Sequence, residues 1–313
     1  MDNNLNIMVV GAGTMGHSIA QVFAMHGFPT TLVDQNRDQL EKAKKLITSN
    51  LQTLYAFGAI SDQGLIEKTQ DYLNYTDDLE AAAPQSNLVV ETIYENAEAK
   101  RALFSILDQV CPADTILTSN TSALNIFEIA QVSHPERLII AHWCTPPHIM
   151  PLVEIVLGPQ TSVQTLETVK NLLILVEKKP VVLNQYAPGF LFNRIGQAIF
   201  REASYIVSQG WATAEDVDEA IKSTYGIRWP FEGPLEARDF IGWDVSLRVT
   251  SFVIPHLCKD TEPSKLATDL CSKGFFGVKA GRGLKDYSHI SIEEAQKLRQ
   301  TKILKMMKAI KDL

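Results

Sequence analysis

Residues 6–34, NIMVVGAGTMGHSIAQVFAMHGFPTTLVD, decide the fold class of this chain. An apolar run of strand length, Asn6–Val10, leads into a glycine-rich turn, and an amphipathic stretch then continues to about His26. A second apolar run follows at Thr30–Val33. Strand, helix and strand in this order predict a βαβ unit with parallel strands and a right-handed crossover.

The turn between the first strand and the first helix reads GAGTMG, the spacing of a phosphate-binding loop. Gly11 closes the strand, Gly13 allows the backbone to approach a pyrophosphate, and Gly16 allows the helix to pack on the sheet. Unpaired N–H groups and the positive end of the helix dipole favour an anion there. We expect the turn, including Thr14 and Met15, to contact a dinucleotide. The spacing alone also fits an ordinary tight turn.

Asp34 ends the second predicted strand, about 20 residues beyond the glycine turn. A carboxylate at that point accepts hydrogen bonds from an adenosine ribose and repels a 2′-phosphate. The cofactor is therefore predicted to be NAD rather than NADP. The alternative is that Asp34 only caps the helix that begins near Arg37.

Apolar runs of strand length alternate with helical segments along the first part of the chain. Further strands are expected at 88–90, 115–118, 138–141, 152–156 and 180–183, with helices at 37–54, 97–110, 123–132 and 163–175. After Asn184 only helices are expected, at 190–209, 214–223, 245–257 and 292–313. These patterns predict an α/β, Rossmann-like doubly wound domain over residues 1–184 and an all-α domain over residues 185–313.

The composition is that of a soluble globular protein. There are 29 basic and 36 acidic side chains, and the net charge of −7 argues against a nucleic-acid partner. Four widely spaced cysteines indicate reduced thiols. Neither a signal peptide nor an apolar run of about 18–20 residues is visible, so we expect a cytoplasmic protein without a membrane partner. His142, Cys144 and His148 fit no common ligand spacing, and no metal is expected.

His142 and Glu154 are the candidate catalytic pair. His142 directly follows the predicted strand RLIIA, where ligands of α/β sheets bind. Glu154 stands inside the apolar run PLVEIV, where an unpaired carboxylate would be costly to bury. A carboxylate bonded to an imidazole fixes its tautomer and raises its basicity, so the imidazole could accept a hydroxyl proton while hydride leaves for nicotinamide.

Ser122 and Asn193 are polar candidates with ordinary alternatives. Ser122 lies in SNTSALNIFEIA, where one of the residues 119–122 is expected to cap the next helix. Asn193 lies in PGFLFNRIGQ, at the start of the first helix of the second predicted domain. Its side chain could face a substrate cleft or solvent.

These features together resemble the 3-hydroxyacyl-CoA dehydrogenase family over nearly the whole chain. The stretches that carry the resemblance are VVGAGTMGHSIAQVFAMHGF, LVVETIYENAEAK, SNTSALNI, AHWCTPPHIMPLVEIV, APGFLFNRI, GPLEARDFIGWD and FFGVKAGRGLKDYS. The resemblance implies that His142 is the base, that Glu154 orients it, and that Ser122 and Asn193 bond the reacting oxygen. It also implies fatty acid metabolism and a homodimer formed through the helical domain.

The resemblance assigns cofactor contacts to Glu95, Lys100 and Lys279. Thr145 stands where the family has an asparagine, and a threonine hydroxyl cannot reproduce the amide. Contacts to cofactor or substrate are therefore expected to shift at Thr145.

Two features separate the candidate substrates. Family members that act on acyl-CoA carry several lysines in the helix after the second strand. In this chain Leu51–Ser61 has no basic residue, and Lys42, Lys44 and Lys45 lie earlier. The segment YGIRW, which contains Arg228, resembles relatives that act on free hydroxy acids, such as carnitine dehydrogenase and the gulonate-oxidising, lambda-crystallin-like branch. Its guanidinium could clamp a substrate carboxylate, or it could lie on the surface with Trp229 in a helical core.

The expected reaction is interconversion of a 3-hydroxy and a 3-keto group with NAD. The family favours a short-chain L-3-hydroxyacyl-CoA such as 3-hydroxybutyryl-CoA. A free hydroxy acid, or a pyridine alcohol as in vitamin B6 breakdown, is the alternative. A non-catalytic, crystallin-like protein and a module that only senses NAD(H) are alternatives of another class.

Overall fold

The computed structural model describes residues 5–311. The chain divides into two compact units, Met1–Arg194 and Ile195–Leu313. The division falls within helix α8 (Phe192–Ser208), later than the boundary suggested by the sequence after Asn184. Each unit is therefore described by itself.

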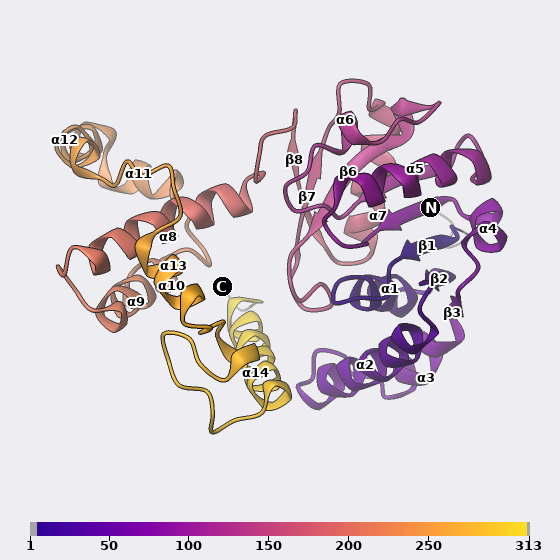
Figure 1. Cartoon of the computed structure of the whole chain (residues 1–313), viewed down its shortest axis with the longest axis horizontal. Helices are drawn as coiled ribbons and strands as arrows, with labels where there is room; N and C mark the ends of the chain where they lie inside the picture. The colour runs from indigo at the N-terminus through magenta and orange to yellow at the C-terminus, as the bar shows by residue number, and fades with distance from the viewer. Residues whose placement is uncertain (1–4, 312–313) are drawn as a thin grey trace. The chain divides into compact units, whose positions relative to one another are not determined.

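The first unit is built on one eight-stranded sheet with the order β3-β2-β1-β4-β5-β6-β7-β8. Figure 1 shows the sheet with helices around it. The strands are β1 (Ile7–Val10), β2 (Thr30–Val33), β3 (Leu73–Thr76), β4 (Leu88–Glu91), β5 (Ile116–Ser119), β6 (Leu138–Trp143), β7 (Leu152–Val156) and β8 (Lys179–Leu183). The chain order reverses between β1 and β4, which is the switch point of a doubly wound fold. The Rossmann-like prediction is confirmed.

Two details of the sheet differ from the sequence prediction. Strand β7 runs antiparallel to β6, whereas the alternation of strands and helices suggested parallel strands throughout. His142 consequently lies inside β6 rather than beyond its end, because pairing with β7 extends the ladder to Trp143. Strand β3 was not predicted, since its four residues LNYT are only partly buried and show no apolar run.

Helices cover both faces of this sheet. They are α1 (Gly16–Met25), α2 (Arg37–Ala56), α3 (Gly64–Asp71), α4 (Leu79–Ala82), α5 (Ala97–Val110), α6 (Ile126–Ile129) and α7 (Val163–Leu175). The segment 123–132 was expected to be helical throughout, but only the single turn α6 forms, and its backbone is extended at Ala130.

Alternation along β1 divides the core into two layers. Ile7 and Val9 pack with residues of α1, α2 and α7, while Met8 and Val10 pack with residues of α5 and α6. Side chains of successive strand residues point to opposite faces, so a strand covered on both sides must be apolar throughout. This is why the run IMVV is a reliable strand signal.

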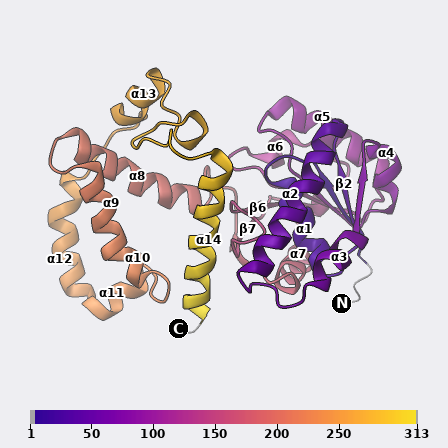
Figure 2. The ribbon, with the colours of Figure 1, turned by 90° about the horizontal axis from the view of Figure 1, so that it is seen from below.

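The second unit is helical, as predicted (Figure 2). Beyond α8 it contains α9 (Ala214–Ser223), α10 (Tyr225–Arg228), α11 (Glu236–Ile241), α12 (Trp243–Val253), α13 (Lys265–Ser272) and α14 (Ile292–Lys311). In its described part the only buried apolar side chains are Cys258, which is 5% exposed, and Leu304, which is 9% exposed. Trp229 is 38% exposed, so it does not occupy a helical core.

No helix within residues 5–311 is both long and apolar enough to cross a membrane. The same residues bring together no group of three or more side chains that could hold a metal ion.

Candidate active site

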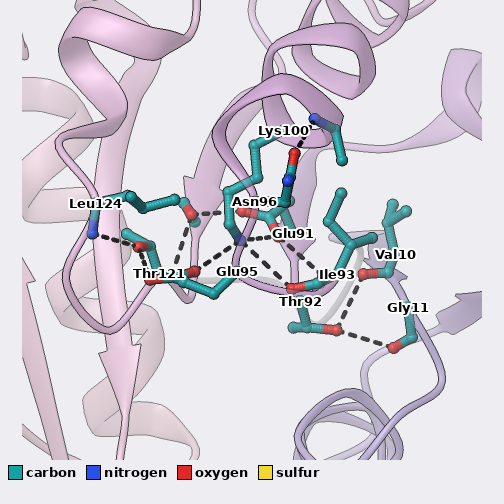
Figure 3. A network of polar contacts seen from close by, with 12 residues as sticks. Val10, Gly11, Glu91, Thr92, Ile93, Glu95, Asn96, Lys100, Thr121 and Leu124 are labelled. Atoms are coloured by element: carbon teal, nitrogen blue, oxygen red, sulfur yellow. Dashed lines mark hydrogen bonds and ion pairs between the residues drawn. The ribbon is translucent and has the colours of Figure 1, made fainter.

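The glycine turn has two positions where a side chain would collide with the protein. A Cβ on Gly16 would lie 1.7 Å from the carbonyl oxygen of Gly11, and Gly11 itself has a φ of +103°. Thr92, just beyond β4, donates from Oγ1 to the carbonyls of Val10 (2.9 Å) and Gly11 (2.8 Å), as Figure 3 shows. The turn is therefore anchored to the neighbouring strand.

Gly13 is different, because a Cβ there would meet nothing within 4 Å. Packing within the protein does not require glycine at this position, whereas close approach of a pyrophosphate does. The turn opens on a pocket of about 600 Å³ with an apolar wall that includes Leu79, Ile93, Leu103 and Ile106. A cavity of this size fits a nucleoside. The residues present therefore fit a dinucleotide cofactor.

Asp34 lines the same pocket and is held by two backbone amides. Its Oδ2 accepts from Ala12 N at 2.8 Å and its Oδ1 accepts from Asn36 N at 2.9 Å. Each carboxylate oxygen keeps a lone pair for a ribose hydroxyl. The alternative helix-cap role is wrong, because the side chain of Asn36 caps α2 through the amides of Asp38 and Gln39.

His142 and Glu154 face each other directly across β6 and β7. His142 Nδ1 lies 2.7 Å from Glu154 Oε2, and Glu154 is completely buried. Glu154 Oε1 accepts from the amides of Leu191 (2.7 Å) and Phe192 (2.8 Å), where α8 begins. Burial opposes ionisation, but the bonds from His142 and these amides outweigh it and hold the pKa of Glu154 below its ordinary value.

The pairing leaves one nitrogen of His142 available. An ionised carboxylate only accepts, so Nδ1 donates to Glu154 and Nε2 keeps its lone pair. Phe190 packs against the imidazole with ring centroids 5.4 Å apart, and its φ of +52° is strained for a bulky residue. That strained position immediately precedes the two amides that hold Glu154.

Ser122 and Asn193 lie together in the first unit. Asn193 Nδ2 donates to the backbone carbonyl of Ser122 at 3.1 Å. Ser122 does not cap α6, whose N-cap position is Asn125. The local turn is instead stabilised by Thr121, whose Oγ1 accepts from Leu124 N at 2.9 Å. The Ser122 hydroxyl is thus not committed to a helix cap.

Glu95 joins the Ser122 loop to a buried ion pair (Figure 3). Its Oε1 accepts from Thr121 Oγ1 at 2.6 Å and Ser122 N at 2.9 Å, and its Oε2 lies 3.4 Å from Lys100 Nζ. Burial works against the charge of Glu95, but the bonds from Thr121 and Ser122 and the charge of Lys100 keep its pKa low. Glu95 therefore fixes the loop that carries Ser122.

The Lys100 side chain is 1% exposed. It lies 2.5 Å from Glu91 Oε1 and 3.4 Å from the carbonyl of Ile93. Ser119 Oγ donates to the other oxygen of Glu91 at 2.5 Å. In this geometry the ammonium of Lys100 contacts the carboxylates of Glu91 and Glu95.

The remaining candidates are Thr145 in the first unit and Arg228 and Lys279 in the second. Thr145 donates from Oγ1 to the sulfur of Met15 at 3.2 Å, which links the loop after β6 to the glycine turn. Arg228 and Lys279 belong to the second unit. There the Arg228 guanidinium lies 5.7 Å from the Tyr225 ring centroid and the Lys279 ammonium 5.5 Å from that of Phe276.

Sequence reasoning missed several groups of the site. The amides of Leu191 and Phe192 carry no sequence signal, because every residue except proline has a backbone N–H. Glu91 did carry one: a carboxylate ends the apolar run LVVE, the same kind of pattern that identified Glu154.

Comparison with known families covers nearly the whole chain. Residues 6–186 match the 3-hydroxyacyl-CoA dehydrogenase NAD binding domain, and residues 189–287 match the 3-hydroxyacyl-CoA dehydrogenase C-terminal domain. The domain matches and the dinucleotide pocket agree on NAD as the cofactor.

Similar proteins differ in the substrate that their names state. The 5-formyl-3-hydroxy-2-methylpyridine 4-carboxylate 5-dehydrogenase of Mesorhizobium japonicum is 31% identical over 96% of each chain. A probable 3-hydroxybutyryl-CoA dehydrogenase of Bacillus subtilis is 36% identical over 90% of this chain and 96% of the relative.

A solved structure of an NAD+-dependent 5-formyl-3-hydroxy-2-methylpyridine 4-carboxylic acid 5-dehydrogenase is 29% identical, with a TM-score of 0.89 over 98% of each chain. Sequence motifs, fold and domain matches agree, and the chain belongs to the 3-hydroxyacyl-CoA dehydrogenase family of NAD-dependent oxidoreductases.

Proposed function

We propose that this chain interconverts a hydroxyl and a carbonyl group with His142 as the general base. The observation that carries this proposal is the 2.7 Å contact between His142 Nδ1 and the buried Glu154 carboxylate. It leaves Nε2 free to take the hydroxyl proton as the carbinol C–O bond becomes a carbonyl. NAD+, when bound, accepts the hydride that leaves the same carbon.

Glu154 stabilises the imidazolium that forms when His142 takes the proton. Its position is fixed by the amides of Leu191 and Phe192 as well as by His142. A carboxylate held on Nδ1–H keeps the ring orientation and favours its charged form. In the reverse direction the same imidazolium returns the proton to the carbonyl oxygen.

Ser122 and Asn193 are proposed to bond the reacting oxygen. Their side chains come from loops that the Asn193–Ser122 contact and the Glu95 bonds hold together. Hydrogen-bond donors placed in advance stabilise charge that develops on an alkoxide.

We propose that the substrate is a small hydroxy compound without coenzyme A. The exposed residues around the end of α2, Gln52, Tyr55, Ala56, Gly58, Ala59 and Ser61, offer no cation for a CoA phosphate. Lys44, about two turns before Gln52, lies 2.6 Å from Glu41 and 4.9 Å from the Tyr75 ring centroid. The similarity to the pyridine carboxylate dehydrogenase supports this reading.

The second candidate is a short-chain L-3-hydroxyacyl-CoA. Its support is the 36% identity to proteins named probable 3-hydroxybutyryl-CoA dehydrogenase. Under the first candidate, Arg228 is the proposed clamp for a substrate carboxylate, and under either candidate Lys279 is a proposed cofactor contact.

Turnover of a substrate panel tests both candidates. NADH formation or consumption would be followed with free 3-hydroxy acids, carnitine, hydroxymethyl pyridine carboxylates and acetoacetyl-CoA. We expect a free compound to reach a kcat/KM of about 10⁴ M⁻¹s⁻¹ or more, and acetoacetyl-CoA to stay well below it. Faster turnover of acetoacetyl-CoA than of every free compound would favour the second candidate.

We also propose that the second unit pairs with a second copy of this chain. Helices α11 and α12 present large apolar side chains that are more than half exposed, namely Phe240, Trp243, Leu247, Val249 and Phe252. Within the chain the main contacts of α12 are its sequence neighbours α11 and the short 3₁₀ turn Ile254–His256. Apolar surface of this extent favours association.

A further inference from the structure

Three polar side chains form a chain of hydrogen bonds between the glycine turn and the loop that follows His142. His17 Nδ1 lies 2.7 Å from the carbonyl oxygen of Gly13, and Ser18 Oγ lies 3.2 Å from His17 Nε2. The same hydroxyl lies 3.0 Å from His148 Nδ1. The hydride transfer proposed above uses none of the three side chains.

With both histidines neutral, the donors and acceptors fit one arrangement. The Gly13 carbonyl only accepts, so His17 donates to it from Nδ1 and accepts from the Ser18 hydroxyl at Nε2. Ser18 Oγ then accepts from Nδ1–H of His148. The three donors therefore follow one direction: His148 donates to Ser18, Ser18 donates to His17, and His17 donates to the Gly13 carbonyl.

Their environment keeps both imidazoles neutral. Burial lowers the pKa of His17. Burial, together with the neighbouring His17 and Lys178, lowers the pKa of His148 to about 3. The arrangement therefore persists at neutral pH.

The two members on α1, His17 and Ser18, are buried, so their bonds cannot be exchanged freely for bonds to water. Ser18 is 2% exposed and His17 is 7% exposed. A buried hydroxyl or imidazole that loses its partner costs about 1–3 kcal/mol. A shift of one member is thus expected to move the next one rather than break the chain.

The loop itself is held from two sides. Lys178 Nζ donates to the carbonyls of Pro147 (2.7 Å) and Met150 (3.2 Å). On the α1 side, His148 bonds to the buried hydroxyl of Ser18. Thr145 of the same loop contacts Met15 of the glycine turn, so the Ser18 bond is one of two links between the loop and the turn.

We propose that His17, Ser18 and His148 are positioning residues that couple the pyrophosphate turn to the loop beyond the base. Contact of a pyrophosphate with the Gly13 peptide changes the bond that His17 makes to its carbonyl, and Ser18 passes the change to His148. The coupling rests on the proposed function in taking His142 as the base. The response of His148 to cofactor binding does not depend on the substrate.

Histidine ring signals test the coupling without turnover. The chain contains 7 histidines, so the ¹⁵N spectrum of histidine-labelled protein is simple, and His148→Asn identifies the signal of His148. NADH is expected to shift the His148 signal in the wild type. The shift is expected to fall about threefold or more in Ser18→Ala, which lacks the hydroxyl, and to persist in Ser18→Thr.

Two results would overturn the coupling: no His148 shift with NADH bound, or the same shift in Ser18→Ala as in the wild type. If Ser18→Ala does not fold, His148→Leu and His148→Asn replace it. The asparagine amide can still donate to Ser18 and leucine cannot, so NADH is expected to bind about threefold to tenfold more weakly to His148→Leu alone. Equal affinity of the two variants would contradict the coupling.

The same experiments separate this inference from the proposed function. NADH binding and ring shifts are measured without substrate. A normal His148 response in a protein that turns over no member of the substrate panel would contradict the proposed substrate and leave the coupling intact.

Discussion

The His142–Glu154 pair shows how one buried charge organises a site. Glu154 is stabilised by one imidazole and two backbone amides, and each of these groups has a second place in the site. The imidazole is the proposed base, and the amides begin the helix that carries Asn193. The carboxylate thus aligns groups from two parts of the chain.

Replacing Glu154 tests the orientation of the base. In Glu154→Gln the amide can rotate its oxygen toward Nδ1–H, but the charge that favours imidazolium is lost. We expect kcat to fall by about 10²-fold while the Kd for NADH changes little. Unchanged kcat would show that the pair has no role in proton transfer.

The lowered pKa of Glu154 also predicts how stability depends on pH. A depressed carboxyl pKa adds stability above the pKa of the unfolded chain, and that stability is lost as the pH falls through the folded value. The melting temperature of the wild type should therefore drop in the acid range more steeply than that of Glu154→Gln. Parallel curves for the two proteins would contradict the assignment.

Asp34 is expected to set the choice of cofactor. The wild type should bind NADH more tightly than NADPH, because the carboxylate repels a 2′-phosphate. Asp34→Asn keeps one acceptor oxygen for the turn and removes the charge. The ratio of the affinity for NADH to the affinity for NADPH should therefore fall about tenfold. Fluorescence titration with both cofactors measures it, and a wild-type ratio near one would contradict the role of Asp34.

At the scale of elements, neighbouring strands place the site through buried polar links. Glu91 at the end of β4 joins Ser119 of β5 to Lys100 of α5, and Glu95 continues the network to the Ser122 loop. Because these links lie between elements, a change in one of them is expected to affect stability and the site together.

Breaking the buried ion pair is expected to destabilise the first unit. Lys100→Met leaves the Glu91 carboxylate uncompensated in the interior, which costs about 3–5 kcal/mol. Adding Glu91→Gln removes the buried charge, and part of the loss should be recovered. Denaturant unfolding measures both variants. A double variant no more stable than Lys100→Met alone would show that the charge is not the cause.

The sequence predicts those elements whose burial dictates their composition. The runs around β1, β4 and β6 are apolar because both faces of the sheet are covered, and the helix predicted at 97–110 is observed as α5. It does not predict β3, which is only partly buried, or the antiparallel direction of β7. The register that sets His142 opposite Glu154 depends on that direction and so becomes visible only in the structure.

The same distinction applies to the candidate site. Residues whose type is unusual for their position, such as Glu154 inside an apolar run and the glycines of the turn, are recognisable in the sequence. The amides of Leu191 and Phe192 are not, because the backbone is the same at every residue. The internal role of Lys100 depends on which way its side chain points, and a sequence does not specify that.

At the scale of the whole molecule, the helical unit lacks a core of its own among its described residues. Large apolar side chains of α11 and α12 remain exposed, which predicts a dimer of the 34.8 kDa chain. Light scattering should give about twice the monomer mass. Phe240→Asp with Phe252→Asp should dissociate it, whereas Val163→Asp, an equally exposed apolar site in the first unit, should not. A monomeric wild type would contradict the proposal.

The assignment of His142 as the base is the central claim, and His142→Gln tests it most directly. Turnover is measured with the best substrate of the panel, and NADH binding is measured separately by fluorescence. We predict that kcat falls by about 10²–10⁴-fold while the Kd for NADH stays nearly unchanged. Activity within a few-fold of the wild type would show that another group takes the proton.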